Sequence, residues 1–451
     1  MPIINEEQVR AATQHNMKLS DEQAKLYMNT NTCMSLEELH AEIERCADLP
    51  FTSATTLPKD AYISEDYFNW EMKNIFRNDW VCLAHVSQIP NNGDFLNIDF
   101  LAEPMIVVRD KSGDIQVLSR ICPHRGMDIM PPGFGHDGHG PAEARAEGED
   151  HGHTRLFLCP YHSWTFDLDG SLKACPEMNK TEDFNRCDWK MKQFKFEVWN
   201  GFVFVNLDGE ATQSVADKYA ELGQELANWK LDELVVAHHS HWEIPCNWKV
   251  LAENFMESYH HLGTHVKSLH TIMPAKNTYN DEEKEQFIHC HLPYGKKACE
   301  EIAETEAKGE QWDAFPVIES LTEEDRLKWE LYMGFPLFTI VTAPEQVVWY
   351  RIEPVGPNKL RLMTSALVPA SVAAKPDFKK WLERGEEEAV WFHLEDMEVL
   401  SAVQRGFYSS GSQRGRLSHL EMSVWLIQRF LAARARGTFP TLDRPAEPAQ
   451  K

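Results

Sequence analysis

The spacing of hydrophobic positions changes along this 451-residue chain and divides it into regions. Up to about residue 58 the sequence is polar and has helical spacing, which predicts helices that end at the linker TSATTLP. From about 83 to 207 short runs such as EPMIVVRD and KFEVWNGFVFVNL predict strands. Asn200 and Gly201, between two alternating runs, are a strong signal for a β-hairpin turn. This region is therefore expected to be a small antiparallel β domain.

The second half of the chain mixes helical and strand patterns. Helical spacing in VADKYAELGQELANW precedes the strand-like run ELVVAHHSHWEI, and further strands are expected at PLFTIVT, EQVVWYRIEPV and KLRLMTSALVPA. Helices follow at about 376–408 and 419–436. This half is expected to be α+β, with an antiparallel sheet and its helices segregated to one side. We place a helical extension at 1–60, the β domain at 61–210 and the α+β domain at 211–451.

Composition narrows the function classes. A formal net charge of −25 argues against a surface for nucleic acid or anionic membranes, which requires a basic patch. The N-terminal segment lacks the basic and apolar regions of a signal peptide, and no run of about 18 apolar residues occurs, so we expect a cytoplasmic protein without a membrane span. Ten cysteines scattered through such a chain are expected to be buried thiols, unless they stand at metal-ligand spacing.

Two cysteines do stand at ligand spacing, each after a predicted strand. Cys122 and His124 lie in CPHRG, and Cys159 and His162 lie in CPYHSW. Two thiolates and two imidazoles can hold one zinc ion tetrahedrally, or a Rieske [2Fe-2S] cluster in which the cysteines bind one iron and the histidines the other. The proline after each cysteine and the pairing of two similar loops favour the cluster, because its two irons need ligands from two facing loops.

A second concentration of possible ligands is ENFMESYHHLGTH, residues 253–265. Asn247 is a suitable N-cap, and WKVLAENFMESYH is expected to continue as one helix, which puts Glu257 and His260 on one face at i, i+3 spacing. Gly263 allows the helix to end or kink, so that His265 can return toward the same point. Two imidazoles and one carboxylate form the facial triad of non-haem Fe(II) oxygenases.

With these motifs the chain resembles the α subunits of Rieske non-haem iron oxygenases, also called aromatic-ring-hydroxylating dioxygenases. CPHRG and CPYHSW resemble that family's cluster loops, and NWKVLAENFMESYHHLGTH resembles its mononuclear iron segment. The resemblance extends from about residue 62 to 435. It implies an α+β fold, with an N-terminal antiparallel β Rieske [2Fe-2S] domain and a helix-grip catalytic domain.

One stretch departs from the family pattern. The 34 residues between His124 and Cys159 exceed the usual separation, and the excess at about 132–153 is rich in glycine, acids and histidine. We interpret it as a solvated surface insertion that spares the cluster loops. The alternative is an extra metal site or docking surface formed by four histidines, His136, His139, His151 and His153.

The resemblance also implies which residues bind the mononuclear iron. His260 and His265 are its histidine ligands, and the carboxylate ligand comes from the late helix AVWFHLEDMEVLSAVQRGF. Asp396 matches the family position. Glu395 is expected to face away, because neighbouring helix residues differ by about 100° in direction.

The remaining polar residues of the segment are expected to support the iron ligands. Glu257 stands where the family has an acid that hydrogen-bonds a ligand histidine and a cluster histidine of the neighbouring chain, so we expect it to bridge the two centres. Aspartate is commoner there, and the resemblance associates glutamate with monooxygenases of quaternary amines. Asn254 resembles a position near the open coordination site, with a structural helix amide as the alternative. His261 is expected to be a supporting or pocket residue.

The activity implied by the resemblance is that of a terminal oxygenase. It would use O2 and two electrons delivered through the Rieske cluster to hydroxylate a small organic substrate, with aromatic ring hydroxylation favoured, as in aromatic hydrocarbon catabolism. The electrons would come from NAD(P)H through a ferredoxin or a flavin reductase, since no G-x-G-x-x-G motif follows a strand in this chain. The implied assembly is a homotrimer, with or without a β subunit.

Other functions stay open on the sequence alone. A monooxygenase could use the same ligands for oxidative N- or O-demethylation or for hydroxylation of a methylated amine. A non-enzymatic Rieske electron carrier would need only the first domain, and the second iron segment argues against it. A zinc-bound structural protein would be colourless and redox-silent.

Overall fold

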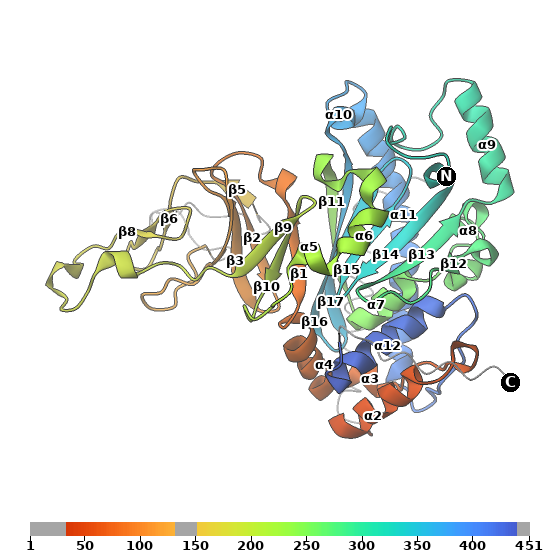
Figure 1. Ribbon diagram of the computed structural model, residues 1–451, viewed down its shortest axis with the longest axis horizontal. Helices are drawn as coiled ribbons and strands as arrows, with labels where there is room; N and C mark the ends of the chain where they lie inside the picture. Colours follow the sequence, from red (N-terminus) through yellow and green to blue (C-terminus); the bar gives the residue numbers. More distant parts are fainter. Residues whose placement is uncertain (1–32, 131–150, 440–451) are drawn as a thin grey trace. The chain divides into compact units, whose positions relative to one another are not determined.

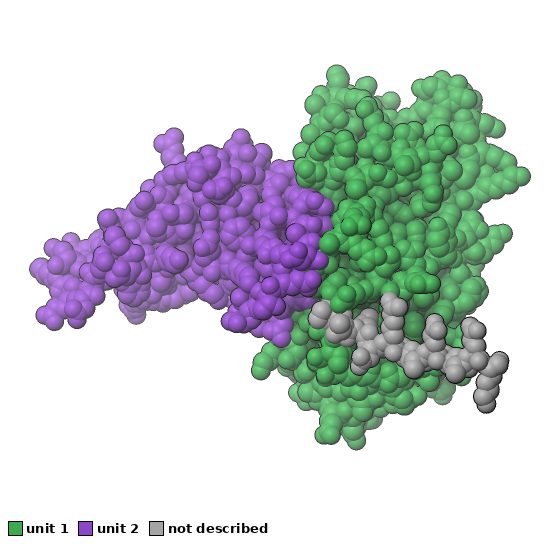
Figure 2. All heavy atoms as spheres, viewed as in Figure 1, with its two compact units in different colours: residues 1–76, 218–451 green, residues 77–217 purple. Residues whose placement is uncertain are grey.

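The computed structural model describes residues 33–130 and 151–439 (Figure 1). The described residues form two compact units, a smaller one within 77–217 and a larger one within 1–76 and 218–451 (Figure 2). These limits differ from the expected ones. The segment 61–76 packs with the larger unit instead of the β domain, and the second boundary falls after Asp217 instead of after residue 210.

The smaller unit consists of antiparallel strands, as its alternating pattern predicts. Its described residues form a four-stranded sheet in the order β4-β3-β2-β5 and two three-stranded sheets in the orders β1-β10-β9 and β6-β7-β8. The strands are β1 (Trp80–His85), β2 (Asp94–Phe100), β3 (Glu103–Arg109), β4 (Ile115–Ser119), β5 (His151–His153), β6 (Phe157–Leu158), β7 (Thr165–Phe166), β8 (Leu172–Ala174), β9 (Lys195–Trp199) and β10 (Phe202–Asn206).

The hairpin between β9 and β10 forms where the sequence predicts it. Trp199 pairs with Phe202, which leaves Asn200 and Gly201 as a two-residue turn. Both have positive φ, +48° and +81°, the backbone conformation that asparagine and glycine adopt most readily in such turns. A side chain at Gly201 would also collide with the ring of His85.

Most of the insertion expected at about 132–153 lies outside the described residues, and so do His136 and His139. Its last residues form β5, where His153 pairs with Asp94 of β2. The exposed His153 ring contacts the Asp94 carboxylate at 2.9 Å. The described end of the insertion therefore forms an edge strand of the four-stranded sheet.

A seven-stranded antiparallel sheet forms the centre of the larger unit (Figure 1). Its order is β11-β17-β16-β15-β14-β13-β12. The strands are β11 (Leu234–Ile244), β12 (Tyr279–Asn280), β13 (Phe287–Pro293), β14 (Lys328–Gly334), β15 (Phe338–Thr342), β16 (Val347–Gly356) and β17 (Lys359–Pro369).

The long helices of the larger unit gather on one face of this sheet. Helix α11 (Phe378–Phe407) places Phe392 against Trp329 of β14 and His393 against Tyr350 of β16. Tyr350 also contacts Phe255, at the end of α7 (Trp248–Phe255). On the opposite face, Tyr219 contacts Gly334 next to the short helix α6 (Ala220–Glu225).

The other described helices of this unit are α2 (Leu36–Ala47), α3 (Asp60–Ile63), α4 (Glu65–Glu71), α8 (Leu269–Ile272), α9 (Lys296–Ala307), α10 (Ala370–Ala373) and α12 (Met422–Arg436). Among all helices in the described ranges, none combines the length and the apolar character that crossing a membrane requires.

The segment before residue 77 belongs to the larger unit because buried polar contacts tie it there. The Trp425 indole N–H donates to the carbonyl of Leu49 at 3.0 Å. The Glu71 carboxylate contacts the Lys249 ammonium at 2.7 Å, and neither side chain is exposed to solvent. These partners lie far apart in the sequence, so their pairing was not predictable from local patterns.

Candidate active site

Helix α7 leads into the candidate iron site. It begins after Asn247, whose side-chain oxygen accepts a hydrogen bond from the Lys249 backbone N–H at 3.1 Å. The sequence predicted this N-cap, but it predicted a longer helix. The helix ends at Phe255 instead of continuing to His260, and a separate 3₁₀ turn covers Tyr259–Leu262.

Glu257 and His260 meet across this break, and not on one helix face as the sequence predicted. One Glu257 carboxylate oxygen accepts the His260 backbone N–H at 3.1 Å, and the other lies 2.8 Å from His260 Nδ1. The carboxylate therefore caps the 3₁₀ turn and orients the imidazole at once. With Nδ1 engaged, Nε2 of His260 is left to face a metal ion.

His265 and Asp396 complete the convergence. His265 is fully buried, and its Nε2 lies 3.1 Å from Asp396 Oδ1. His260 Nε2 lies 3.7 Å from the same oxygen. Ligands that each lie about 2 Å from one metal ion show separations of this size. The three residues fit the donor set of two imidazoles and one carboxylate that leaves positions open for oxygen on a non-haem iron.

Glu395 was expected to face away from this site, but its side chain faces it. Its Oε2 accepts from His265 Nδ1 at 2.7 Å and from the Ser268 hydroxyl at 2.6 Å. The expectation failed because His265 lies beside α11 and reaches both neighbouring acids, one with each ring nitrogen. Glu395 thus orients His265 in the way that Glu257 orients His260.

The electrostatics of the site reflect this pairing. Burial would raise the pKa of Asp396, but the His265 hydrogen bond and the charges of both histidines outweigh burial and hold that pKa below its usual value. Burial would lower the pKa of His265, and its two carboxylate partners reverse the shift, so the pKa is raised. The shifts show that Asp396 and His265 stabilise each other's charged form, and a cation could take the place of the imidazole proton beside the carboxylate.

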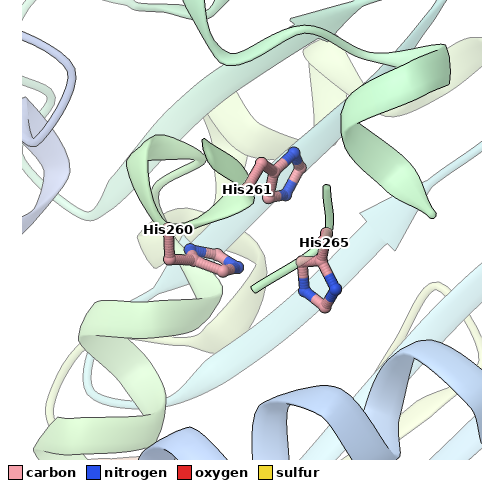
Figure 3. A group of neighbouring side chains, drawn as sticks. All are labelled: His260, His261 and His265. Atoms are coloured by element: carbon pink, nitrogen blue, oxygen red, sulfur yellow. The ribbon is translucent and has the colours of Figure 1, made fainter. Parts of the chain in front are cut away.

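His261 was expected to be a supporting or pocket residue. Its ring lies as close to His260 and His265 as a third metal ligand could. One ligand atom from each of His260, His261 and His265 lies within 4.8 Å of the others (Figure 3). Burial, followed by the two neighbouring rings, lowers the pKa of His261 to about 3. The ring is neutral at physiological pH and forms a third imidazole at the site.

Asn254 lies on the metal side of α7. Its amide nitrogen is 3.5 Å from Asp396 Oδ1, the oxygen that also faces the two histidines. The side chain can therefore position the carboxylate. Among the residues of ENFMESYHHLGTH, Glu253 instead accepts hydrogen bonds from the buried Tyr62 hydroxyl, at 2.8 and 3.0 Å.

The two cysteine–histidine loops of the smaller unit have matching backbones. The N–H of Gly126 donates to the carbonyl of Cys122 at 3.0 Å, and the N–H of Ser163 donates to that of Cys159 at 3.0 Å. Gly126 and Ser163 each have positive φ, +73° and +58°. Each loop therefore folds around its cysteine in the same tight turn.

The side chains of these loops form two pairs. The thiols are both buried, and burial together with the Cys159 thiol raises the pKa of Cys122 to about 11. The rings of His124 and His162 lie 4.6 Å apart between centroids, and the buried Nδ1 of His124 has no hydrogen-bond partner. A pair of thiols and a pair of imidazoles match the two irons of a Rieske cluster.

A single zinc ion fits these loops less well. Tetrahedral ligands at zinc distances lie within about 4 Å of one another. Among the described residues, three ligand atoms within 4.8 Å of one another occur at His260, His261 and His265 and at Asp281, His289 and His291, not at the cysteine loops.

Comparison with known proteins places both units in families. Residues 79–194 match the model of the Rieske [2Fe-2S] domain. Residues 227–437 match the model of the ring hydroxylating alpha subunit (catalytic domain). The first match contains all four cysteine and histidine residues of the loops, and the second contains Glu257, His260, His265 and Asp396.

The chain is also similar to individual relatives and to a solved structure. The carnitine monooxygenase oxygenase subunit of Acinetobacter pittii is 33% identical over 209 residues, which is 46% of this chain and 52% of that protein, so the match spans about half of the relative. The glycine betaine monooxygenase oxygenase subunit of Chromohalobacter salexigens is 26% identical over 394 residues, 80% of this chain and 82% of that protein. The fold is similar to a crystal structure of the quaternary ammonium Rieske monooxygenase CntA, with a TM-score of 0.69 and 22% identity over 87% of this chain and 98% of that chain.

Proposed function

The chain belongs to the family of Rieske non-haem iron oxygenase α subunits, and on that premise we propose that it is a terminal oxygenase that hydroxylates a small organic substrate with O2. The observation that carries the proposal is the approach of His260 Nε2 and His265 Nε2 to one oxygen of Asp396, at 3.7 and 3.1 Å. When bound there, Fe(II) would supply the chemistry of oxygen activation.

The supporting carboxylates give this triad its fixed geometry. Glu257 and Glu395 accept the Nδ1 protons of His260 and His265, so each ring presents the lone pair of Nε2 toward Asp396. Asn254 steadies the Asp396 carboxylate from α7. In this proposal His261 remains a neutral ring beside the ligands, where it excludes water and shapes the pocket.

Electrons would enter through the smaller unit. We assign Cys122 and Cys159 to one iron of a [2Fe-2S] cluster and His124 and His162 to the other, in keeping with the matching turns of the two loops. A ferredoxin or a flavin reductase would deliver the electrons from NAD(P)H. Glu257 would accept a second hydrogen bond from a cluster histidine of a neighbouring chain in a trimer, and a β subunit is compatible with this arrangement.

For the substrate class we propose a methylated amine, in preference to the aromatic ring that the sequence favoured. Two observations support this choice. The curated relatives described above are named for carnitine and glycine betaine, both quaternary amines. The bridging acid is Glu257, whereas aspartate is commoner in the family. Ring hydroxylation remains the second candidate, because the matching catalytic domain is that of ring hydroxylating alpha subunits.

Metal analysis and spectroscopy test the oxygenase proposal. Anaerobic purification followed by Fe(II) loading should give three irons per chain, two in the cluster and one in the triad, with a reducible Rieske EPR signal. Asp396→Ala should lose the third iron and keep the signal. Two irons per chain in the loaded protein would leave only an electron carrier, and zinc without colour would indicate a structural protein.

Oxygen uptake tests the substrate class. The loaded protein is combined with a reductase and NADH, and uptake is measured with carnitine, glycine betaine, methyl ethers and aromatic acids. We expect substrate-dependent uptake with a methylated amine, accompanied by product of demethylation or hydroxylation. Coupled turnover of an aromatic acid alone would replace this substrate class by ring hydroxylation and leave the oxygenase proposal intact.

A further inference from the structure

A second group of metal-ligating side chains lies on the face of the sheet opposite to α11. On β13, Cys290 faces α12, where Ser423 hydrogen-bonds its thiol. Side chains alternate along a strand, so His289 and His291 point to the other face. The cross-strand partner of His291 is Glu330 of β14. We call Asp281, His289, His291, Glu330 and Glu225 the Asp281 cluster.

The two imidazoles of this cluster lie between carboxylates at both ends. Their ring centroids are 3.9 Å apart. At one end Asp281 contacts His289 Nδ1 at 3.1 Å and His291 Nε2 at 3.0 Å. At the other end Glu330 Oε1 lies 3.1 Å from His291 Nδ1 and 3.4 Å from His289 Nε2.

This arrangement needs more positive charge than two neutral imidazoles provide. Four ring nitrogens face carboxylate oxygens, whereas two neutral rings carry only two N–H groups. Either both rings take an extra proton, or a cation replaces the protons at one end.

The Glu330 end is already occupied by donors from the protein. The Lys328 ammonium lies 2.9 Å from Glu330 Oε1, and the Tyr332 hydroxyl donates to Oε2 at 3.3 Å. A carboxylate fixed in this way is suited to accept N–H from both histidines. With those two N–H groups directed at Glu330, His289 Nδ1 and His291 Nε2 would be unprotonated, and their lone pairs would face Asp281.

At the Asp281 end the Lys284 ammonium lies 3.1 Å from Glu225 Oε1 and 3.9 Å from Asp281 Oδ2, so a cation of the protein already stands beside these two acids. The other oxygen, Glu225 Oε2, lies 2.9 Å from His289 Nδ1. The side chains of Asp281 and Glu225 are 31% and 22% exposed, whereas those of His289 and His291 are 5% and 9% exposed. An ion could therefore enter from solvent past the two acids and meet buried imidazoles. One ligand atom from each of Asp281, His289 and His291 lies within 4.8 Å of the others.

We propose that the Asp281 cluster binds a zinc ion through His289 Nδ1, His291 Nε2 and the Asp281 carboxylate, with Glu225 beside His289 and Glu330 as the orienting carboxylate. Two imidazoles and a carboxylate suit a divalent transition metal of zinc type better than Mg²⁺ or Ca²⁺, which prefer oxygen ligands. The sheet separates this site from the iron triad. The proposal is independent of the oxygenase activity.

Zinc binding is measured on the full, iron-loaded chain. The protein is dialysed against low micromolar free Zn²⁺, and zinc and iron are counted by mass spectrometry. We expect one zinc per chain with all three irons retained. Asp281→Asn, which changes a partly exposed side chain, should weaken zinc binding by about tenfold or more while it keeps the iron count.

Two controls separate this site from other histidines. His238→Gln removes an imidazole that pairs with Glu386 at 2.8 Å on β11 and should leave zinc binding unchanged. Asp396→Ala removes the iron triad and should also retain the zinc. Zinc bound by Asp281→Asn as tightly as by the wild type would overturn the proposal, as would its loss in Asp396→Ala.

A crystal of the zinc-dialysed wild-type protein gives a test that does not depend on the folding of any variant. Anomalous scattering at the zinc edge should show a peak bonded to His289 Nδ1 and His291 Nε2. A protein that binds no zinc under these conditions, or a peak located only at the iron triad, would mean that the cluster is a doubly protonated ion-pair network.

Discussion

Each of the two histidines proposed to bind the iron is held by an acid of its own. Glu257 engages Nδ1 of His260 at 2.8 Å, and Glu395 engages Nδ1 of His265 at 2.7 Å. Such a contact selects the tautomer and fixes the rotation of the ring, so that Nε2 stays directed at the metal position. The two acids differ in what else they contact, and this difference gives them separate tests.

Glu257→Gln should impair turnover and leave both metal sites filled. An amide can still accept the His260 N–H, but it cannot accept a second imidazole N–H with a full charge, so electron delivery should suffer. We expect three irons per chain, a reducible Rieske signal and oxygen uptake at least about tenfold lower. Glu386→Gln, which alters the carboxylate beside His238 on β11, is the control. Normal turnover in Glu257→Gln would refute the bridging role.

Glu395→Gln should act on the mononuclear iron itself. Its carboxylate accepts from His265 Nδ1 and from the Ser268 hydroxyl, and a neutral amide makes His265 a less basic ligand. We expect about 10- to 100-fold weaker Fe(II) binding in titrations, with the cluster signal unchanged. Glu398→Gln changes an exposed acid three residues further along α11 and should behave like the wild type. Equal affinities in the two variants would show that Glu395 does not support the ligand.

At the scale of elements, α7 carries Asn254 and leads directly to Glu257. The helix is fixed at its start by the Asn247 cap and along its buried side by the Lys249–Glu71 pair. Glu71 belongs to α4, so the segment before the smaller unit holds the helix of the active site in place. This contact explains why residues 61–76 pack with the larger unit.

Lys249→Met should destabilise the protein strongly. It leaves the Glu71 carboxylate fully buried without its cation, which typically costs about 3–5 kcal/mol of unfolding free energy. The measurement is the free energy of unfolding by chemical denaturation. The double variant Glu71→Met/Lys249→Met removes both charges and should recover most of the loss. A single variant as stable as the wild type would mean that the pair does not anchor α7.

At the scale of the whole molecule, the two cysteine–histidine loops and the proposed iron triad lie in different compact units of the chain. Each unit has its own sheets, and the smaller one has its own core around Phe166 and Trp164 under the cysteine loops. The proposed trimer would bring the cluster of one chain to the triad of the next. That arrangement has a direct genetic test.

Chains with complementary defects should restore each other. Cys122→Ser should abolish the cluster and Asp396→Ala the mononuclear iron, so each variant alone should be inactive. Co-expressed in one assembly, they place an intact cluster next to an intact triad across a subunit boundary, and oxygen uptake should reappear at a fraction of the wild-type rate. Two differently tagged copies of Asp396→Ala serve as the control. Mixed assemblies without activity would argue for electron transfer within one chain.

Local sequence patterns were sufficient to predict features that depend only on neighbouring residues. The two cysteine–histidine loops, the Asn200-Gly201 hairpin and the N-cap at Asn247 each depend on a few neighbouring residues. The α+β class followed from the order of periodic segments. Asp396 was proposed as an iron ligand only through family resemblance, since 131 residues separate it from His265.

What only the tertiary structure decided depends on contacts between distant segments. Helix α7 ends at Phe255, and the Glu257 carboxylate accepts a backbone N–H of the turn that follows, which helical spacing cannot reveal. Glu395 turns toward the site because a buried histidine lies beside α11. The Asp281 cluster exists because a sheet pairs His291 with Glu330. The sequence by itself determined which metal chemistry this protein can support, because ligand types and their local spacing are written along the chain. The position and orientation of those ligands were decided by packing, because each needs a partner that only the fold brings near.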